Sequence, residues 1–148
     1  MTDHPTPHVT LTATAHAPAL ELPAIGQGTW YMGEGLAPRS DEVRALQQGL
    51  ELGLTLIDTA EMYPVNPVSK ETVGRTEEII GTWNAANTAR RAEYILASKH
   101  SGEGMMHARD GAPISAQTIP EAVEGSLRRL QTDYIDLYQF HWPNRGSY

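Results

Sequence analysis

Four side chains of types that donate, accept or stabilise protons stand at or just past the ends of strand-like runs. These are Asp58, Tyr63, Lys99 and His141. The runs, residues 55–57, 94–98 and 135–140, are apolar enough to lie in a parallel sheet that is buried on both faces. If the three strands are neighbours in one sheet, their carboxyl ends meet at the same edge. The spacing therefore predicts that the four side chains converge in one site.

Three segments with helical spacing alternate with these runs. Apolar residues recur at intervals of three and four over about 40–52, 75–86 and 118–131, which predicts three helices. Alternating strands and helices favour a parallel sheet with right-handed crossovers. Each helix is expected to bury one apolar face. The predicted inner residues are Val43, Leu46 and Leu50 in the first helix, Ile79, Ile80 and Trp83 in the second, and Val123, Leu127 and Leu130 in the third.

Capping signals locate the ends of two of these helices. Ser40 is predicted to cap the first helix, since its hydroxyl can accept from the free amides of the first turn. Gly53 is predicted to end that helix, because glycine tolerates the left-handed conformation that follows many helix C-termini. Thr118 and Glu121 have the spacing of a capping box, in which each side chain accepts a hydrogen bond from the other residue's amide.

The segment before the first helix contains a hairpin and a further strand. Residues 9–14 alternate at period two and can pair with residues 19–22 across a His-Ala-Pro turn. This hairpin is expected to plug or cover the main fold. Residues 24–29 are the predicted first strand of the main sheet, and residues 1–7 are expected to fray.

Two long loops follow strand ends. One covers residues 64–72 and contains two prolines, and the other covers residues 100–117 and is rich in glycine. Loops of more than about 12 residues without secondary structure are usually functional or mobile. The second loop is therefore expected to be functional or mobile.

The order of elements is a hairpin followed by β-α-β-α-β-α-β, which is an α/β arrangement. Two closures are open at this point: a doubly wound sheet, or the first half of an eight-stranded β/α barrel, which usually has about 250 residues. Gly26-Gln-Gly28 lacks the third glycine of a dinucleotide fingerprint, and no Walker sequence is present. A length of 148 residues favours a single domain over 1–148, with a partly flexible tail and hairpin in 1–18.

Composition excludes several classes of protein. The net charge of −7, without a cluster of Lys and Arg, disfavours nucleic-acid binding. No apolar run is long enough to span a membrane, so a soluble protein is expected. The sequence has no cysteine, which rules out disulfides and thiolate metal sites and fits a reducing compartment such as the cytoplasm. No metal site is predicted, because five of the six histidines show no metal-ligand spacing with acids: His4, His8, His16, His100 and His107.

Four segments in this order resemble the active-site strands of the aldo-keto reductases. They are Gly26-Gln-Gly-Thr-Trp30, Ile57-Asp-Thr-Ala-Glu-Met-Tyr63, Ala97-Ser-Lys99 and Tyr138-Gln-Phe-His-Trp142. Residues 127–137 are similar to the passage of that family from its third helix to its fourth strand, and the resemblance extends from about residue 20 onward. It implies a (β/α)8 TIM barrel, of which this chain has the first half, and an NADPH-dependent reduction of aldehydes or ketones.

The resemblance also implies a catalytic role for each strand-end residue. Hydride transfer leaves charge on the carbonyl oxygen, and Tyr63 is the implied proton donor. Lys99 is expected to favour the phenolate and thereby lower the pKa of Tyr63, while Asp58 pairs with Lys99 and holds it in place. His141 is expected to orient the carbonyl or to share in proton delivery.

Cofactor and substrate residues follow from the same resemblance. Gly28, Thr29, Trp30 and Asp58 are implied to bind NADPH, and Trp30 and Trp142 to contact a small carbonyl substrate. A buried core position explains either tryptophan equally well. In the family, the loops that hold the nicotinamide amide, the pyrophosphate and the 2′-phosphate belong to the second half of the barrel, which the resemblance does not cover.

Several alternatives are open. The portion up to Tyr63 and the portion from Pro64 onward resemble two branches of the family, so a natural truncation, a deliberately made half-barrel and a mosaic look alike. A non-catalytic binding or regulatory module and an inactive half-barrel are alternatives to a reductase. In a half-barrel the interior residues, expected to include Ile57, Leu96 and Leu137, are exposed, which predicts self-association through open sheet edges.

Overall fold

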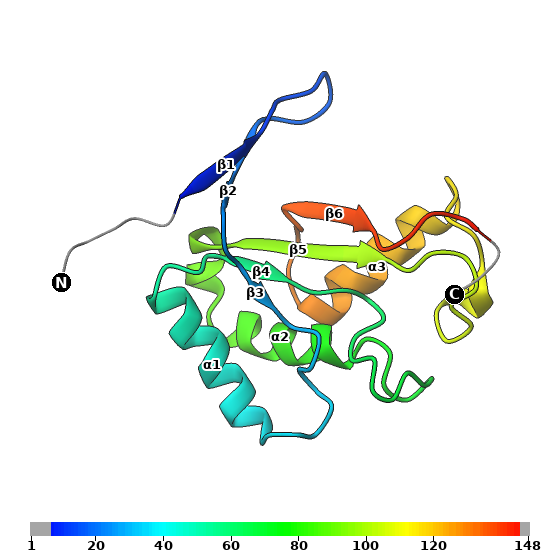
Figure 1. Cartoon of the computed structure of the whole chain (residues 1–148), viewed down its shortest axis with the longest axis horizontal. Helices are drawn as coiled ribbons and strands as arrows, with labels where there is room; N and C mark the ends of the chain where they lie inside the picture. The colour runs from blue at the N-terminus through cyan, green and yellow to red at the C-terminus, as the bar shows by residue number, and fades with distance from the viewer. Residues whose placement is uncertain (1–6, 146–148) are drawn as a thin grey trace.

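A four-stranded parallel sheet forms the centre of the computed structural model, which describes residues 7–145 (Figure 1). The strands are β3 (Gln27–Gly28), β4 (Leu56–Asp58), β5 (Ile95–His100) and β6 (Leu137–Phe140), and they lie side by side in chain order. The helices between them are α1 (Arg39–Glu51), α2 (Arg75–Ala86) and α3 (Thr118–Leu130). The predicted α/β order and the parallel pairing are confirmed.

The bounds of the strands differ from those predicted. The first strand is only Gln27–Gly28 rather than residues 24–29. β5 runs through Lys99 to His100, and therefore extends past the predicted strand end. Lys99 and His100 stay in the strand because they pair with Gln139 and Phe140 of β6.

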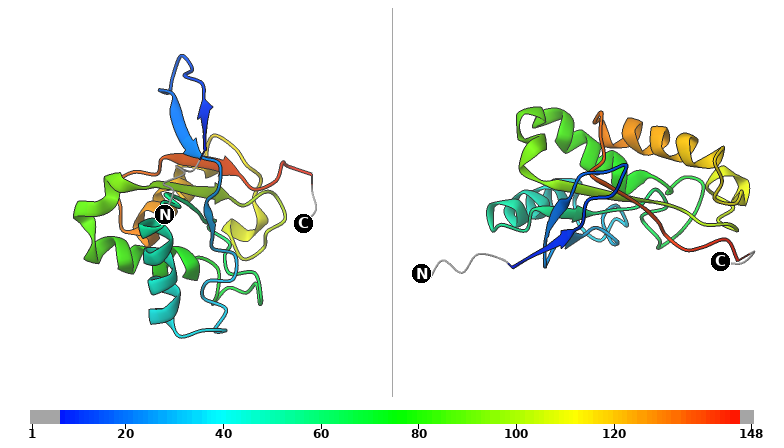
Figure 2. Two further views of the ribbon diagram at one scale, coloured as in Figure 1. Left: turned by 60° about the vertical axis from the view of Figure 1, so that its left-hand side comes forward. Right: turned by 90° about the horizontal axis from the view of Figure 1, so that it is seen from above.

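The N-terminal hairpin is confirmed but does not cover the sheet. β1 (His8–Leu11) pairs antiparallel with β2 (Leu20–Pro23). All four residues of β1 are exposed, and the hairpin projects away from the parallel sheet in Figures 1 and 2. The prediction of a plug or cover is therefore wrong for this structure. Residues 1–6 of the predicted flexible tail lie outside the described residues.

The main core lies between the sheet and the helices. The prediction that Ile57 and Leu96 face the barrel interior is wrong, because both lie in this core. Ile57 and Leu96 are fully buried against Leu46, Leu50, Ile80, Trp83, Tyr94 and Leu130, most of which come from the helices. Side chains alternate along a strand, so Leu56 and Ile95, which pair with each other, face the opposite side. Leu137 pairs with Ala97 and therefore lies on the same side of the sheet as Ile95. The side chains of Leu56, Ile95 and Leu137 are half-buried.

Helix α3 packs through small residues rather than through the predicted Val123 and Leu127. Its buried residues are Ala122, Gly125, Ser126 and Leu130, whereas Val123 and Leu127 are half-buried. The reason is the close approach of α2 and α3, which lie side by side in Figure 2. A Cβ atom on Gly81 of α2 would collide with the backbone carbonyl of Arg129 in α3. The predicted inner faces of α1 and α2 are confirmed, with Val43 half-buried.

The helix ends confirm one capping prediction and correct two. Gly53 has a φ of 86°, and its amide and that of Leu54 donate to the carbonyls of Leu50 and Gly49, which closes α1 as predicted. Ser40 is the second residue of α1, and Pro38 stands at the N-cap instead. The first free amides of that helix therefore donate to the Pro38 carbonyl.

The cap of α3 lies three residues upstream of the predicted one. The Thr118 amide donates to Oγ of Ser115 (3.1 Å), and the Ser115 amide donates to Oγ1 of Thr118 (3.0 Å). The Thr118 hydroxyl thus accepts from the Ser115 amide, and Thr118 and Glu121 do not form the predicted capping box. The sequence Pro-x-Ser-x-x-Thr occurs at 67–72 and again at 113–118, and in both copies the Thr hydroxyl donates to the Pro carbonyl at 2.8 Å.

Candidate active site

Asp58 and Lys99 form the centre of the site at the carboxyl ends of β4 and β5. The ammonium of Lys99 donates to Oδ1 and Oδ2 of Asp58, each at 2.8 Å, and to the carbonyl of Thr59 at 2.8 Å. An ammonium has three N–H groups, so all of its donors are satisfied within the protein. The register of β4 and β5 brings the two residues together, because Asp58 pairs with Ala97 and Lys99 is two residues further along the same face.

Tyr63 lies in the loop that carries the chain back over this strand end. Its aromatic ring is 5.4 Å from the Lys99 ammonium and 5.5 Å from the ring of His141. The amide of Tyr63 donates to the carbonyl of Ala60, and its own carbonyl accepts from the amide of Thr76 at the start of α2. The structure therefore brings the side chains of Asp58, Lys99, Tyr63 and His141 together at one end of the sheet.

The electrostatics of Tyr63 run opposite to the sequence-based expectation. Burial, and then the negative charge of Asp58, raise the pKa of Tyr63 to about 12. Lys99 was expected to lower this pKa, but its charge is balanced by the carboxylate that it contacts at 2.8 Å. Tyr63 therefore holds its proton firmly at neutral pH, as a donor rather than as a phenolate.

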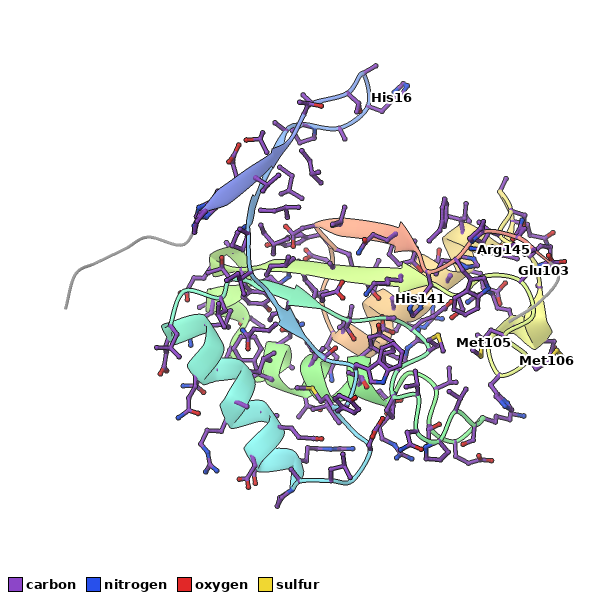
Figure 3. All side chains as sticks on the ribbon, in the orientation of Figure 1. His16, Glu103, Met105, Met106, His141 and Arg145 are labelled. Atoms are coloured by element: carbon purple, nitrogen blue, oxygen red, sulfur yellow. The ribbon has the colours of Figure 1, made fainter. Side chains whose placement is uncertain are left out.

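His141 follows β6 and points toward the same end of the sheet, as Figure 3 shows. Burial, and then the charge of Lys99, lower the pKa of His141 below its ordinary value, so the imidazole is neutral at pH 7. Its Nδ1 atom is buried and has no hydrogen-bond partner within residues 7–145. A buried polar atom without a partner is uncommon in a native structure, and it marks His141 as a group with capacity to bind a ligand.

The candidate cofactor and substrate residues surround this cluster, with one exception. Trp30 is 47 % exposed and its ring lies 5.5 Å from that of Tyr63, while the ring of Trp142 lies 5.1 Å from that of His141. Gly28 pairs with Asp58, and a Cβ atom there would meet nothing within 4 Å. Thr29 is the exception, since it is buried and its hydroxyl donates to the Asp58 carbonyl at 3.0 Å. Its contact therefore fixes β3 to β4.

Two further buried ion pairs behind the site were missed by the sequence reasoning. Glu61 pairs with Arg109, and Glu77 pairs with Arg129 and accepts from the hydroxyl of Ser98. Glu61 and Glu77 are nearly or fully buried. The sequence contains only a weak signal for the first pair. Glu61 is an acid between Asp58 and Tyr63, and Arg109 is the one arginine in the long glycine-rich loop.

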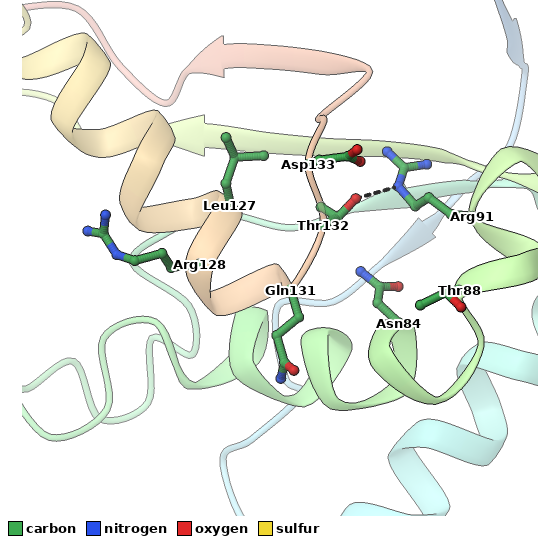
Figure 4. Close-up of a pocket in the computed structure, with 8 residues that line it drawn as sticks. All are labelled: Asn84, Thr88, Arg91, Leu127, Arg128, Gln131, Thr132 and Asp133. Carbon is green, nitrogen blue, oxygen red and sulfur yellow. Dashed lines mark hydrogen bonds between the residues drawn. The ribbon is translucent and has the colours of Figure 1, made fainter.

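A groove of about 580 Å³ lies at the opposite end of the sheet, and it contains none of the predicted site residues (Figure 4). Arg91 is its main charged group, and that guanidinium is already engaged by Asp136 at 2.6 Å and Thr132 at 3.1 Å. It also lies over the rings of Tyr94 and Tyr134, at 5.0 and 3.8 Å. The groove therefore surrounds Arg91, a side chain with a structural role at the N-terminal ends of β5 and β6.

Residues 7–145 contain neither a cluster of metal ligands nor a membrane-spanning helix. No group of three or more His, Cys, Asp or Glu side chains there is placed to hold a metal ion. In the same part of the chain, no helix has the length and apolar character needed to cross a membrane.

Comparisons with known proteins agree with this geometry. The model of the aldo/keto reductase family matches residues 24–148. Methylglyoxal reductase YeaE of Escherichia coli (strain K12) is 46 % identical over 131 residues, which are 87 % of this chain and 38 % of that protein. Protein tas of the same strain is 43 % identical over 132 residues, or 87 % and 37 %.

A solved structure shares the arrangement as well as the sequence. The crystal structure of an aldo-keto reductase from Klebsiella pneumoniae in complex with NADPH is 42 % identical, with a TM-score of 0.64, and the match covers 84 % of this chain and 37 % of that one. The chain therefore spans somewhat more than a third of the length of these relatives, and its sheet matches part of their barrel.

Proposed function

Because this chain belongs to the aldo/keto reductase family, we propose that it is the tetrad-bearing half of an NADPH-dependent oxidoreductase that reduces aldehydes or ketones to alcohols. The observation that carries the proposal is the convergence of Asp58, Lys99, Tyr63 and His141 at one strand end. The substrate class is a small carbonyl compound, and the absence of cysteine is consistent with action in the cytoplasm.

In this proposal, Tyr63 donates the proton that the carbonyl oxygen needs when it is reduced. Its pKa of about 12 keeps it protonated at neutral pH, so the donor is in the correct state before substrate binds. Asp58 holds Lys99 beside the ring of Tyr63 by two hydrogen bonds, which fixes the ammonium 5.4 Å from the ring and balances its charge. His141 is neutral, and it orients the carbonyl by a hydrogen bond from its imidazole.

NADPH, when bound, supplies the hydride, and this chain offers residues for its nicotinamide end only. Trp30 presents an exposed ring beside Tyr63, and the open position at Gly28 leaves the strand end free of side chain next to Asp58. Thr29 supports them by fixing β3. The relative from Klebsiella pneumoniae was crystallised with NADPH, which supports the choice of cofactor. Trp142 closes the substrate side next to His141.

A second candidate function is a binding or regulatory module without catalysis, or an inactive half-barrel. The raised pKa of Tyr63 favours it, because a phenol that is harder to ionise is a weaker acid. Carbonyl-dependent oxidation of NADPH by the assembled barrel distinguishes the two functions, since only a reductase consumes the cofactor.

The test is Tyr63→Phe in this chain joined to the remaining barrel strands of a relative such as methylglyoxal reductase YeaE. We expect turnover to fall by roughly 10²- to 10⁴-fold, because the proton donor is lost, while NADPH affinity stays nearly unchanged. Tyr134→Phe is the matched control, since Tyr134 lies by Arg91 at the opposite end of the sheet. Unchanged turnover in Tyr63→Phe would rule out the general-acid assignment.

A further inference from the structure

The long loop between β5 and α3, residues 101–117, meets the segment that carries Tyr63 at a buried ion pair. Nη1 of Arg109 donates to Oε2 of Glu61 and Nη2 donates to Oε1, both at 2.6 Å. Glu61 is 2 % exposed, and the Arg109 side chain is 12 % exposed. The proposed chemistry uses neither residue, so this buried charge pair needs a separate explanation.

Glu61 is attached to the end of β5 by its backbone and by its side chain. Its amide donates to the carbonyl of Lys99 at 3.3 Å, and its Oε1 atom accepts from the amide of Ser101. Lys99 in turn donates to the carbonyl of Thr59. Glu61 stands two residues before Tyr63, so the position of its carboxylate fixes the backbone on which the Tyr63 ring is mounted.

Arg109 keeps this carboxylate charged. Burial alone would raise the pKa of Glu61, but the hydrogen bonds and the charge of Arg109 outweigh it and hold that pKa below its ordinary value. A carboxylate that is nearly buried without such a partner would be strongly destabilised. The anchoring of Glu61 to β5 therefore depends on Arg109.

The same loop shares a hydrophobic cluster with Tyr63 and is hydrogen-bonded to Trp142. Met105 and Ala108 are buried in one cluster with Ala60, Met62 and Tyr63. The indole N–H of Trp142 donates to the carbonyl of Glu103 at 3.2 Å. Figure 3 shows Glu103, Met105 and His141 at this end of the molecule. The loop thus connects the two sides of the proposed substrate site.

The backbone of the loop is strained at the ion pair. Arg109 has a φ of 49° and the next residue, Asp110, has a φ of 53°. Non-glycine residues in the left-handed region are uncommon, and they persist where the surrounding structure holds them. The side chain of Arg109 is held by its two hydrogen bonds to Glu61 and lies 3.3 Å from Nδ1 of His100, while its carbonyl accepts from the amide of Ala112 within the loop. Docking on the Tyr63 segment is therefore one of the contacts that hold the loop in this form.

We propose that Arg109 is a positioning residue for Tyr63, which acts by clamping Glu61 and so docks the 101–117 loop against the site. The role of Arg109 in catalysis rests on the proposed function, in which Tyr63 is the proton donor. Without the clamp, the segment from Thr59 to Tyr63 detaches from β5, and Tyr63 loses its fixed place beside Lys99 and His141.

The alternative is that the ion pair only adds to overall stability. The chain contains a matched pair for this comparison, because Arg91 is 10 % exposed and binds Asp136 at 2.6 Å at the other end of the sheet. Arg109→Met and Arg91→Met remove the same charge from two arginines of similar exposure, 12 % and 10 %, whose acidic partners Glu61 and Asp136 have side chains that are 3 % and 20 % exposed. A merely stabilising role predicts the same effect of both substitutions on the Tyr63 segment.

The experiment measures hydrogen exchange of the 148-residue chain at the amides of Glu61 and Tyr63, which donate to Lys99 and Ala60. We expect Arg109→Met to accelerate their exchange by roughly tenfold or more, and Arg91→Met to leave them within about twofold of wild type. In parallel, NMR titration of His141 is expected to show its lowered pKa moving back toward the ordinary value in Arg109→Met only. Arg109→Lys, which keeps the charge, should restore part of the protection.

Equal acceleration by both arginine variants, or no acceleration by Arg109→Met, would overturn the proposal. If Arg109→Met fails to fold, the double variant Glu61→Gln with Arg109→Met removes both charges and is scored by the same criteria. The hydrogen-exchange and NMR measurements do not depend on enzymatic turnover. Full activity of Tyr63→Phe would therefore remove the proposed function and leave the exchange result standing.

Discussion

At the scale of single residues, the partner of Lys99 decides the proton chemistry of Tyr63. Lys99 lies close enough to the ring to favour a phenolate, yet its three donors are bound by Asp58 and Thr59. Asp58 therefore has two effects, since it holds the ammonium in place and its own charge raises the pKa of Tyr63. Removal of the Asp58 charge separates its effect on the position of Lys99 from its effect on the pKa of Tyr63.

Asp58→Asn is expected to lower the pKa of Tyr63 from about 12, because the nearby negative charge is lost and the Lys99 charge is no longer balanced. Ultraviolet difference titration measures this pKa, with Tyr63→Phe as the reference spectrum. Asp136→Asn, in the ion pair at the opposite end, is the control. A Tyr63 pKa that stays near 12 in Asp58→Asn would show that burial alone sets it.

The same pKa predicts how stability depends on alkaline pH. A phenol whose folded-state pKa is raised contributes stability below its unfolded value of 10.0, and this contribution is lost as the pH rises toward about 12. The unfolded chain releases the proton first, so unfolding becomes easier over that range. The loss should be smaller in Asp58→Asn, where the two pKa values lie closer together.

Residue types and spacing were sufficient to find the four strand-end side chains, because a parallel sheet places strand ends together whatever lies between them. They were insufficient for the pKa of Tyr63 and for the Glu61–Arg109 pair. These depend on which charge neutralises which, and Glu61 and Arg109 are 48 residues apart with an irregular loop between them. No local pattern predicts such a contact.

At the scale of elements, the helix extents and the C-terminal end of α1 at Gly53 were predictable, and the N-terminal caps of α1 and α3 were not. Apolar spacing fixed α2 at residues 75–86, because the buried side chains Ile79, Ile80 and Trp83 recur at helical intervals. A cap depends on one side chain and on the chain direction before the helix. Ser40 and Thr118 both have suitable hydroxyls, but Pro38 and Ser115 occupy the positions that the backbone makes available.

Ser115→Ala is expected to destabilise the chain by about 1 kcal/mol, since it removes the acceptor for the amide of Thr118 at the start of α3. Ser40→Ala is the matched control and should change the free energy of unfolding by less than about 0.5 kcal/mol, because the Ser40 side chain is not the cap of α1. Urea denaturation of both variants measures the difference. If Ser40→Ala costs more than Ser115→Ala, the assignment of the caps is wrong.

At the scale of the whole molecule, the two faces of the sheet differ in how well they are covered. The helices bury Ile57 and Leu96 completely, whereas Leu56, Ile95 and Leu137 on the other face are half-buried. The sequence could not distinguish the faces, since both carry apolar residues, as is usual for a parallel strand. The outer edges of β3 and β6 also carry backbone groups that no further strand of residues 7–145 pairs with.

This open face leads to the last prediction, which is that the 148-residue chain self-associates and binds NADPH negligibly on its own. Leu56, Ile95 and Leu137 are already half-buried, so completing the burial of each one gains about half of the roughly 1.5 to 3 kcal/mol that full burial of an exposed side chain gives. Pairing of two copies along β6 would also satisfy the free edge. Phe140, which is 57 % exposed on β6, should contribute to that contact. The residues of 7–145 that we propose for NADPH lie at its nicotinamide end, and the resemblance to the family assigns the phosphates to loops of the second half of the barrel.

Sedimentation velocity measures the mass, and quenching of the three tryptophans measures NADPH binding. Phe140→Lys should shift the chain toward monomer, because it places a charge on the edge strand. Leu52→Lys is the control, since Leu52 is 79 % exposed at the C-terminal end of α1 and belongs to neither edge strand. A cooperatively unfolding monomer that binds NADPH with micromolar affinity would mean that these four strands suffice for the cofactor, and that the half-buried face needs no cover.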